Sequence, residues 1–104
     1  MKIFAVVVAT VDSYYDYKDK HPEHDQHQIA WFKEQHEKGT LLCCGPFLPA
    51  DGTGIWLLRA ETLDEAQEIA QSSPRAKDGL LAPETRIVEW GVHIGEGLIA
   101  QTQQ

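Results

Sequence analysis

Long apolar runs alternate with polar stretches along the chain, and this pattern predicts strands separated by helices and loops. The first run, residues 3–11, is β-branched and apolar almost throughout, which predicts a strand buried on both faces. Apolar runs bounded by turn residues predict further strands over 40–47, 54–60 and 84–93. The polar segment 12–20 carries tyrosines with little periodicity, so we expect a loop there.

Start and stop signals predict two helices, over 22–38 and 62–72. Pro22 suits a first helical position, and Gly39 supplies a C-terminal stop for the first helix. The second helix opens on Thr62, which a glutamate follows three residues later, as in a capping box.

The first helix has two neighbouring faces of different character. Ile29 and Phe32 lie on an apolar face, whereas His24, Gln28 and Trp31 follow the i, i+4, i+7 line of the face beside it. His24 is therefore expected to point where Trp31 points.

The order strand, helix, strand, strand, helix, strand predicts an α+β fold of the ferredoxin-like βαββαβ type. In this fold, two helices cover one face of a four-stranded antiparallel sheet. The other face stays uncovered, and the first strand is apolar on both sides, which predicts a homodimer that packs sheet against sheet. The 104-residue chain suits one domain over 1–95, followed by a C-terminal tail over 96–104.

Charge and cysteine usage narrow the class of partner. Nine basic residues against sixteen acidic ones give a formal charge of −7, with no basic run, which argues against nucleic acid and anionic membranes as partners. Adjacent Cys43 and Cys44 point to opposite faces of a strand and are poorly placed to bond each other. With no signal-peptide pattern and no apolar stretch of about 18 residues, we expect a cytoplasmic protein that binds a small molecule.

His24, at the start of a helix, is the main candidate for chemistry, because an imidazole titrates near neutral pH and can act as a general acid or base. The expected site holds an aromatic or enol-type substrate between Trp31, Phe47 and Trp56, with Ser73 as a polar contact. The alternative is a water-exposed histidine in a polar first turn.

Cofactor motifs are missing from the sequence. It contains no phosphate-binding G-x-x-x-x-G-K-[ST] loop, no dinucleotide-binding G-x-G-x-x-G and no G-x-S-x-G nucleophile elbow. His24 forms metal-like spacings with His21 or His27, but no carboxylate or cysteine completes a ligand set. We therefore expect neither a cofactor nor a metal.

Several short motifs occur in a characteristic order along residues 1–95. They are Lys2-Ile3-Phe4-Ala5, His21-Pro22-Glu23-His24, Gly39-Thr40-Leu41-Leu42 with Gly45-Pro46, Gly54-Ile55, Leu63-Asp64-Glu65-Ala66, Ser73-Pro74 with Gly79-Leu80, and Glu89-Trp90. Together these motifs resemble the YciI-like family, which is defined by the YCII-related domain. The resemblance implies a dimeric α/β barrel with a small pocket in each subunit, where a histidine faces an aspartate as an acid–base pair. It also implies a proton-transfer lyase or isomerase.

The chain departs from the family pattern at both members of that pair. Where the family has Arg-Pro-x-His, the chain ends the motif at His24, and the stretch to Gly39 is about one helical turn longer. Counting back from Gly39 places Gln28 at the histidine position, but His24 lies one turn away on the same face.

The second departure concerns the carboxylate. The family's Asp-Pro is Ser73-Pro74 in this chain, and a serine can hydrogen-bond an imidazole without stabilising an imidazolium as a carboxylate does. Asp78, Asp16 and Asp19 are the alternative partners.

Two functions follow: an enzyme that uses His24 as general acid or base, or a non-catalytic ligand-binding or pathway-accessory dimer that has lost the pair. A purely structural domain is the third reading.

Overall fold

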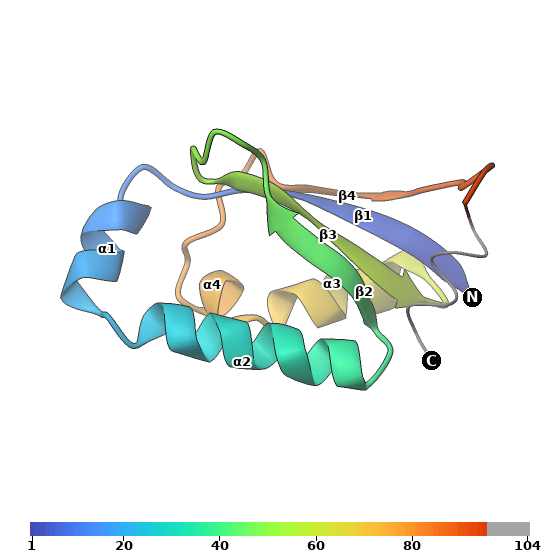
Figure 1. The fold of residues 1–104 in the computed structure, drawn as a ribbon, viewed down its shortest axis with the longest axis horizontal. Helices are drawn as coiled ribbons and strands as arrows, with labels where there is room; N and C mark the ends of the chain where they lie inside the picture. The colour runs from blue at the N-terminus through green and yellow to red at the C-terminus, as the bar shows by residue number, and fades with distance from the viewer. Residues whose placement is uncertain (96–104) are drawn as a thin grey trace.

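The computed structural model describes residues 1–95 and shows one antiparallel sheet with helices along one of its faces (Figure 1). In chain order the elements are β1 (Lys2–Ala9), α1 (Tyr14–Lys20), α2 (His24–Glu37), β2 (Leu41–Pro46), β3 (Thr53–Ala60), α3 (Leu63–Gln71), α4 (Pro74–Lys77) and β4 (Arg86–Glu89). The predicted tail over 96–104 lies outside the described residues.

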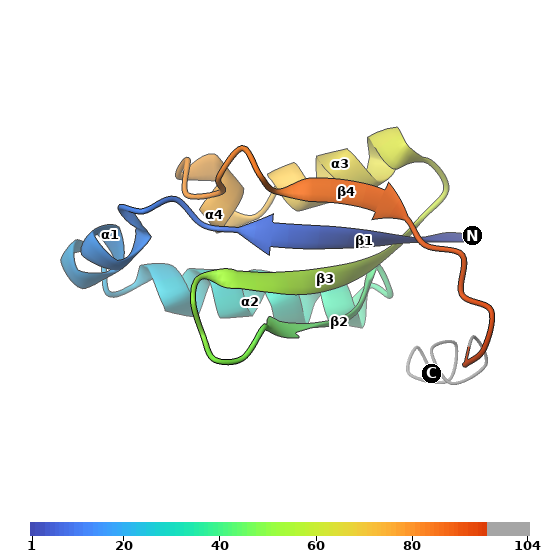
Figure 2. The same cartoon turned by 90° about the horizontal axis from the view of Figure 1, so that it is seen from above.

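The sheet has the strand order β2-β3-β1-β4, with every neighbouring pair antiparallel (Figure 2). This is the ferredoxin-like order, so the predicted fold class is confirmed. β1 is a central strand: Val6 lies opposite Trp56 of β3 on one side and Ile87 of β4 on the other. Its central place explains why nearly every residue of β1 is apolar.

The prediction of a loop over 12–20 was wrong, because residues Tyr14–Lys20 form the helix α1. The helix presents one buried side chain, Tyr14, so its sequence has no apolar stripe that a periodicity argument could detect. An i, i+4 ion pair between Asp16 and Lys20, 3.2 Å apart, lies on its exposed side. Figure 1 shows α1 beyond the end of the sheet, on the side of the helix layer.

The residues on the inward face of α2 differ in part from those expected. The buried side chains are His24, Gln28, Trp31 and Gln35, whereas Ile29, expected on an apolar face, is 52% exposed. The helix therefore packs through amide, imidazole and aromatic groups, and the predicted His24–Gln28–Trp31 line is the one that faces inward. The helix begins at His24, two residues later than predicted.

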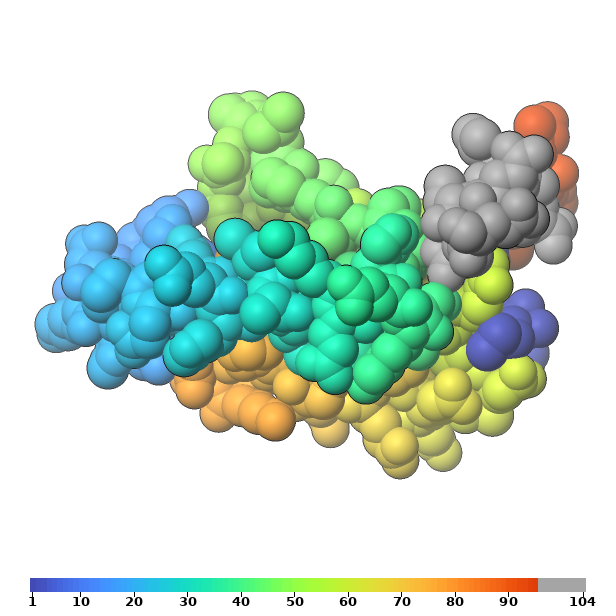
Figure 3. Space-filling model, turned by 60° about the horizontal axis from the view of Figure 1, so that its bottom comes forward, coloured from blue at the N-terminus to red at the C-terminus, as the bar shows by residue number. Residues whose placement is uncertain are grey.

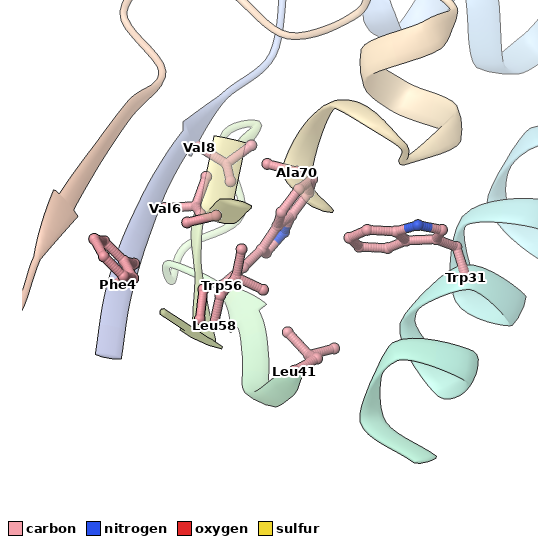
Figure 4. Close-up of a cluster of buried hydrophobic side chains, with 10 residues drawn as sticks. Phe4, Val6, Val8, Trp31, Leu41, Trp56, Leu58 and Ala70 are labelled. Carbon is pink, nitrogen blue, oxygen red and sulfur yellow. The ribbon is translucent and has the colours of Figure 1, made fainter. Parts of the chain in front are cut away.

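The main core lies between the sheet and the helices. Trp31 reaches from α2 toward Trp56 of β3, with the two ring centroids 5.4 Å apart, and aliphatic side chains of β1 and β3 complete the cluster (Figure 4). Ala66 and Ala70 of α3 let that helix approach the sheet closely. This core fixes α2 against the sheet and so positions the start of α2, where His24 lies.

The opposite face of the sheet carries a second, smaller apolar cluster. Ala5, Leu42 and Leu57 are buried there by their neighbours, and Ile55 and Val88 are half-buried beside them. No helix within residues 1–95 covers this face (Figure 2). Among these residues, no helix is long and apolar enough to cross a membrane.

Candidate functional site

A buried imidazole pairs with an exposed carboxylate where α2 begins and α4 ends. His24 is the first residue of α2 and is 2% exposed, and its Nδ1 lies 3.1 Å from Oδ2 of Asp78. A carboxylate can only accept a hydrogen bond, so in the neutral imidazole the proton belongs on Nδ1. The other nitrogen, Nε2, is buried and has no hydrogen-bond partner within the described residues. Such a nitrogen is free to accept a proton from a bound molecule.

Two tyrosines of α1 cover this pair. The rings of Tyr14 and Tyr17 meet the His24 ring edge to face, with centroids 6.3 Å and 5.6 Å away. Burial and the nearby Asp78 carboxylate raise the pKa of the Tyr17 hydroxyl above its ordinary value. Tyr17 therefore stays protonated near neutral pH, and its edge toward His24 remains uncharged.

Gln28 and Ser73 occupy the two positions where the resemblance places the acid–base pair, and both are completely buried. The Gln28 Oε1 accepts a hydrogen bond from the backbone N–H of Arg75 at 3.0 Å. The Ser73 hydroxyl accepts one from the backbone N–H of Ala76 at 3.2 Å and so caps α4. Within residues 1–95 the side chain that accepts a hydrogen bond from His24 is Asp78 and not Ser73.

The aromatic residues expected to bind substrate lie in different surroundings. Trp31 is a core residue, and its Nε1 donates to the Ser72 hydroxyl at 3.0 Å. Phe47 lies in the β2–β3 connection and is 43% exposed. Trp56 is buried in the main core but also lines a cavity, so it is the predicted binding residue that borders open space.

Two adjoining cavities lie close to α1 and α4. The outer one, about 260 Å³, lies between α1 and the β2–β3 connection, which are the blue atoms at the left and the green projection at the top of Figure 3. It is lined by Thr10, Tyr14, Tyr15, Lys18, Pro46, Ala50, Gly52, Thr53 and Arg75. The inner one, about 200 Å³, is lined by Val8, Phe32, Cys44, Gly45, Pro46, Gly54, Trp56 and Arg75. His24 is absent from both linings, because Tyr14 lies between it and the outer cavity.

Gly54 lines the inner cavity at a point where β2 and β3 approach each other closely. A Cβ at this position would lie 2.6 Å from the backbone oxygen of Gly45, so the close approach of β2 and β3 requires glycine. Cys44 also lines this cavity, and burial together with the neighbouring Cys43 raises the pKa of its thiol. A protonated thiol is a poor nucleophile, which leaves Cys44 as an apolar part of the wall.

Arg75 lines both cavities and was missed by the sequence interpretation. Its Nη2 donates to the Tyr14 hydroxyl at 3.0 Å, and its guanidinium lies 5.2 Å from the centre of the Tyr14 ring. The Tyr14 hydroxyl donates in turn to Oδ1 of Asp25 at 3.2 Å, and Lys18 pairs with Oδ2 of Asp25 at 3.0 Å. The signal in the sequence that could have pointed to Arg75 is its place as a cation directly after Ser73-Pro74, where α4 begins.

Among residues 1–95, no group of three or more His, Cys, Asp or Glu side chains lies close enough together to hold a metal ion.

Comparison with known proteins places this site in context. The fold resembles that of a 5-chloro-2-hydroxyhydroquinone dehydrochlorinase from Burkholderia phenoliruptrix AC1100, solved in complex with 2,5-dihydroxybenzoquinone. The TM-score is 0.67 at 19% sequence identity, over 88% of this chain and 95% of that one. No curated protein sequence matches the chain.

The family is established by a separate comparison. The model of the YCII-related domain matches residues 1–91, which is most of the chain. This agrees with the ordered motifs of the sequence and with the ferredoxin-like fold. The chain therefore belongs to the YCII-related domain family.

Proposed function

We propose that this protein is a small-molecule acid–base enzyme of the lyase or isomerase type, with His24 as the proton-transferring residue and Asp78 as its partner. The observation that carries this proposal is the paired imidazole: Nδ1 of the buried His24 is 3.1 Å from the partly exposed Asp78 carboxylate, and Nε2 has no partner among the described residues. Because the proton of the neutral ring is on Nδ1, where it is donated to Asp78, the basic lone pair is on Nε2. The resemblance expects a carboxylate at Ser73, and Asp78 supplies one instead.

The proposed chemistry begins when Nε2 removes a proton from a carbon or hydroxyl of the bound ring compound. The imidazolium that forms is stabilised by the Asp78 carboxylate at its Nδ1–H. Returning this proton to another atom of the compound completes an isomerisation, whereas loss of a leaving group completes an elimination. Because Nε2 is buried beneath Tyr14 and Tyr17, substrate access requires that these rings move.

The solved relative supports the class of substrate. Its name describes removal of chloride from a chlorinated hydroquinone, and its bound molecule is a hydroxylated quinone. We propose that this chain takes a ring compound of similar size and acidity. Cavities of about 260 Å³ and 200 Å³ are small beside the roughly 300–1,000 Å³ typical of drug-sized ligands, which suits a single ring.

The proposal is tested by incubating the protein with chlorinated hydroquinones and hydroxyquinones in D₂O and following chloride release and deuterium uptake. We expect turnover by the wild-type protein and a loss of roughly 100-fold or more in His24→Gln, the scale of general acid–base catalysis. Asp78→Asn should lose about 10-fold or more, because it no longer stabilises the imidazolium.

His27→Gln is the matched control, since His27 is an exposed histidine of the same helix. It should retain wild-type turnover. Equal activities of the His24 and His27 variants on every compound that turns over would overturn the proposal.

A second candidate function is ligand binding without conversion, and one observation favours it. Neither of the two adjoining cavities is lined by His24. Saturable binding of a ring compound, with neither chloride release nor deuterium uptake over hours, would identify a binding or pathway-accessory protein.

We further propose that the protein acts as a homodimer in a reducing compartment such as the cytoplasm. The half-buried apolar side chains Ile3, Ile55 and Val88 on the uncovered sheet face support self-association, because apolar surface gathered on one face often marks an interface between subunits. Cys43 and Cys44 are free thiols, which suits a reducing compartment.

A further inference from the structure

Both adjoining cavities have cationic side chains in their walls and no carboxylate. The outer cavity is bordered by Lys18 and Arg75, and Arg75 is the charged residue of the inner one. This contrasts with the chain as a whole, which has a formal charge of −7. The two cavities therefore form a locally positive region on a protein whose net charge is negative.

The positive charge is not fully neutralised by its neighbours. Asp25 is the acid in contact with the two cations: it lies 3.0 Å from Lys18 Nζ but 3.8 Å from Arg75 Nη2. One carboxylate thus faces two cations, and its shorter contact is to Lys18. Arg75 is left as the less neutralised of the two.

Arg75 also has hydrogen-bonding capacity to spare. A guanidinium carries five N–H donors, and Nη2 uses one of them on the Tyr14 hydroxyl. The Nε of Arg75 is buried and has no hydrogen-bond partner among the described residues. The other donors, on Nη1 and Nη2, make no further hydrogen bond among the described residues, so an ionised oxygen in the cavity can accept from them.

The rest of the inner cavity suits the flat, apolar part of a ligand. Trp56 and Phe32 contribute aromatic surface, with ring centroids 5.4 Å apart, and Val8 contributes aliphatic surface. Gly54, which has no side chain, also lines this cavity. A mostly apolar lining with one charged group is typical of a small-molecule site, and here the charged group is a cation that suits an anionic ring compound.

We propose that Arg75 is the anion receptor of a binding site shared by the two cavities, and that this site selects ring compounds carrying an ionised carboxylate or enolate oxygen. The ring lies against Trp56 and Phe32, and the ionised oxygen accepts hydrogen bonds from Arg75. This inference deepens the proposed function by naming its substrate class, and as a substrate site it rests on that function. The role of Arg75 in binding can nevertheless be measured separately.

The test is isothermal titration calorimetry with three single-ring probes: 4-hydroxybenzoate, which carries a carboxylate; 2,5-dihydroxybenzoquinone, which ionises to an enolate; and neutral 4-hydroxybenzyl alcohol. We expect at least one anionic probe to bind about 10-fold or more tightly than the neutral one, as hydrogen bonds to a charged group predict. Comparison of the two anions identifies which kind of oxygen the site prefers.

Arg75→Gln should weaken the preferred anion by about 10-fold or more and leave the neutral probe unchanged. Lys77→Gln is the matched control, because Lys77 is an exposed cation of the same helix and lies outside both cavity linings. It should bind like wild type. Should Arg75→Gln fail to fold, Lys18→Gln provides a second variant, with a loss expected that is again specific to the anion.

Three results would overturn the inference: no preference for either anion over the alcohol, equal losses in the Arg75 and Lys77 variants, or no binding of either anion at millimolar concentration. His24→Gln separates this inference from the proposed function. If the His24→Gln variant binds the anion normally and the wild-type protein turns over no compound, the anion receptor is retained and the enzyme is rejected. If turnover depends on His24 but neither anion binds more tightly than the alcohol, the enzyme is retained and the anion receptor is rejected.

Discussion

At the scale of single residues, the chemistry depends on what each nitrogen of His24 contacts. Asp78 lies 3.1 Å from Nδ1, whereas Nε2 is enclosed without a partner. Burying a polar atom without a hydrogen bond costs free energy, and a ligand or water that bonds the atom removes that cost. The same argument applies to Nε of Arg75, and both atoms lie around Tyr14.

Asp25 provides a residue-scale prediction for stability. Burial acts to raise the pKa of this carboxyl, but the hydrogen bond and charge of Lys18, with help from Tyr14 and Arg75, hold the pKa below its ordinary value. A carboxyl whose pKa is depressed by folding contributes stability above its unfolded pKa, and that contribution is lost as the pH falls through the folded pKa. Asp25→Asn should therefore lower the free energy of unfolding at neutral pH by about 0.5–1 kcal/mol, the range for a partly exposed pair.

Urea unfolding near neutral pH and near the acid end of the carboxyl range measures this effect. The difference between Asp25→Asn and wild type should shrink on acidification, because the wild-type carboxyl is then protonated. Asp19→Asn, which alters an exposed acid of α1, is the control and should change little at either pH. A difference that stays constant with pH would show that the ion pair does not stabilise the fold.

At the scale of elements, α1 determines what the site can reach. It is a seven-residue helix whose hydrogen bonds and ion pairs to the rest of the domain are few: Tyr14 and Lys18 bond Asp25 of α2, and Arg75 of α4 bonds Tyr14. Short helices of this kind gain most of their stability from tertiary contacts. Movement of α1 would therefore expose His24 without disturbing the sheet.

The elements also show how much could be predicted from the sequence. The strands and α3 follow from apolar runs and from caps such as Thr62, whose hydroxyl accepts from the Glu65 amide at 3.1 Å, whereas α2 follows from the start and stop signals at Pro22 and Gly39. The helix α1 could not be found this way, because Tyr14 is its one buried side chain. Its order comes from partners distant in sequence, which no local pattern reveals.

The same limit applies to the site. The inward direction of His24 follows from its spacing to Trp31, since both lie on the buried face of α2. The pairing of His24 with Asp78 does not follow from the sequence. It depends on α4, which Ser73 caps and which brings Asp78 at its end to His24. The contribution of Arg75 likewise depends on the way α4 approaches Tyr14, 61 residues away along the chain.

At the scale of the whole molecule, the proposed homodimer depends on the uncovered sheet face. Ile55 of β3 is half-buried on this face, next to the cluster of Ala5, Leu42 and Leu57. We expect the wild-type protein to be a dimer in light scattering coupled to gel filtration. Ile55→Lys should produce a folded monomer, because a lysine there would place a charge in the middle of an apolar interface.

Ile29→Lys is the matched control for that experiment. Ile29 lies on α2, is 52% exposed and is remote from the sheet face, so this variant should remain a dimer. A monomeric wild-type protein at micromolar concentration would contradict the sheet-to-sheet assembly. An Ile55→Lys protein that remains dimeric would place the interface elsewhere.

The central claim is that His24 keeps Nε2 free as a base while Nδ1–H donates to Asp78. The most direct measurement is NMR of the ¹⁵N-labelled imidazoles, with the His24 signals assigned by their absence in His24→Gln, because it reports the tautomer without requiring a known substrate. We predict that neutral His24 carries its proton on Nδ1, and that Asp78→Asn changes the population of this tautomer. A neutral ring protonated on Nε2, with signals unaffected by Asp78→Asn, would contradict the account.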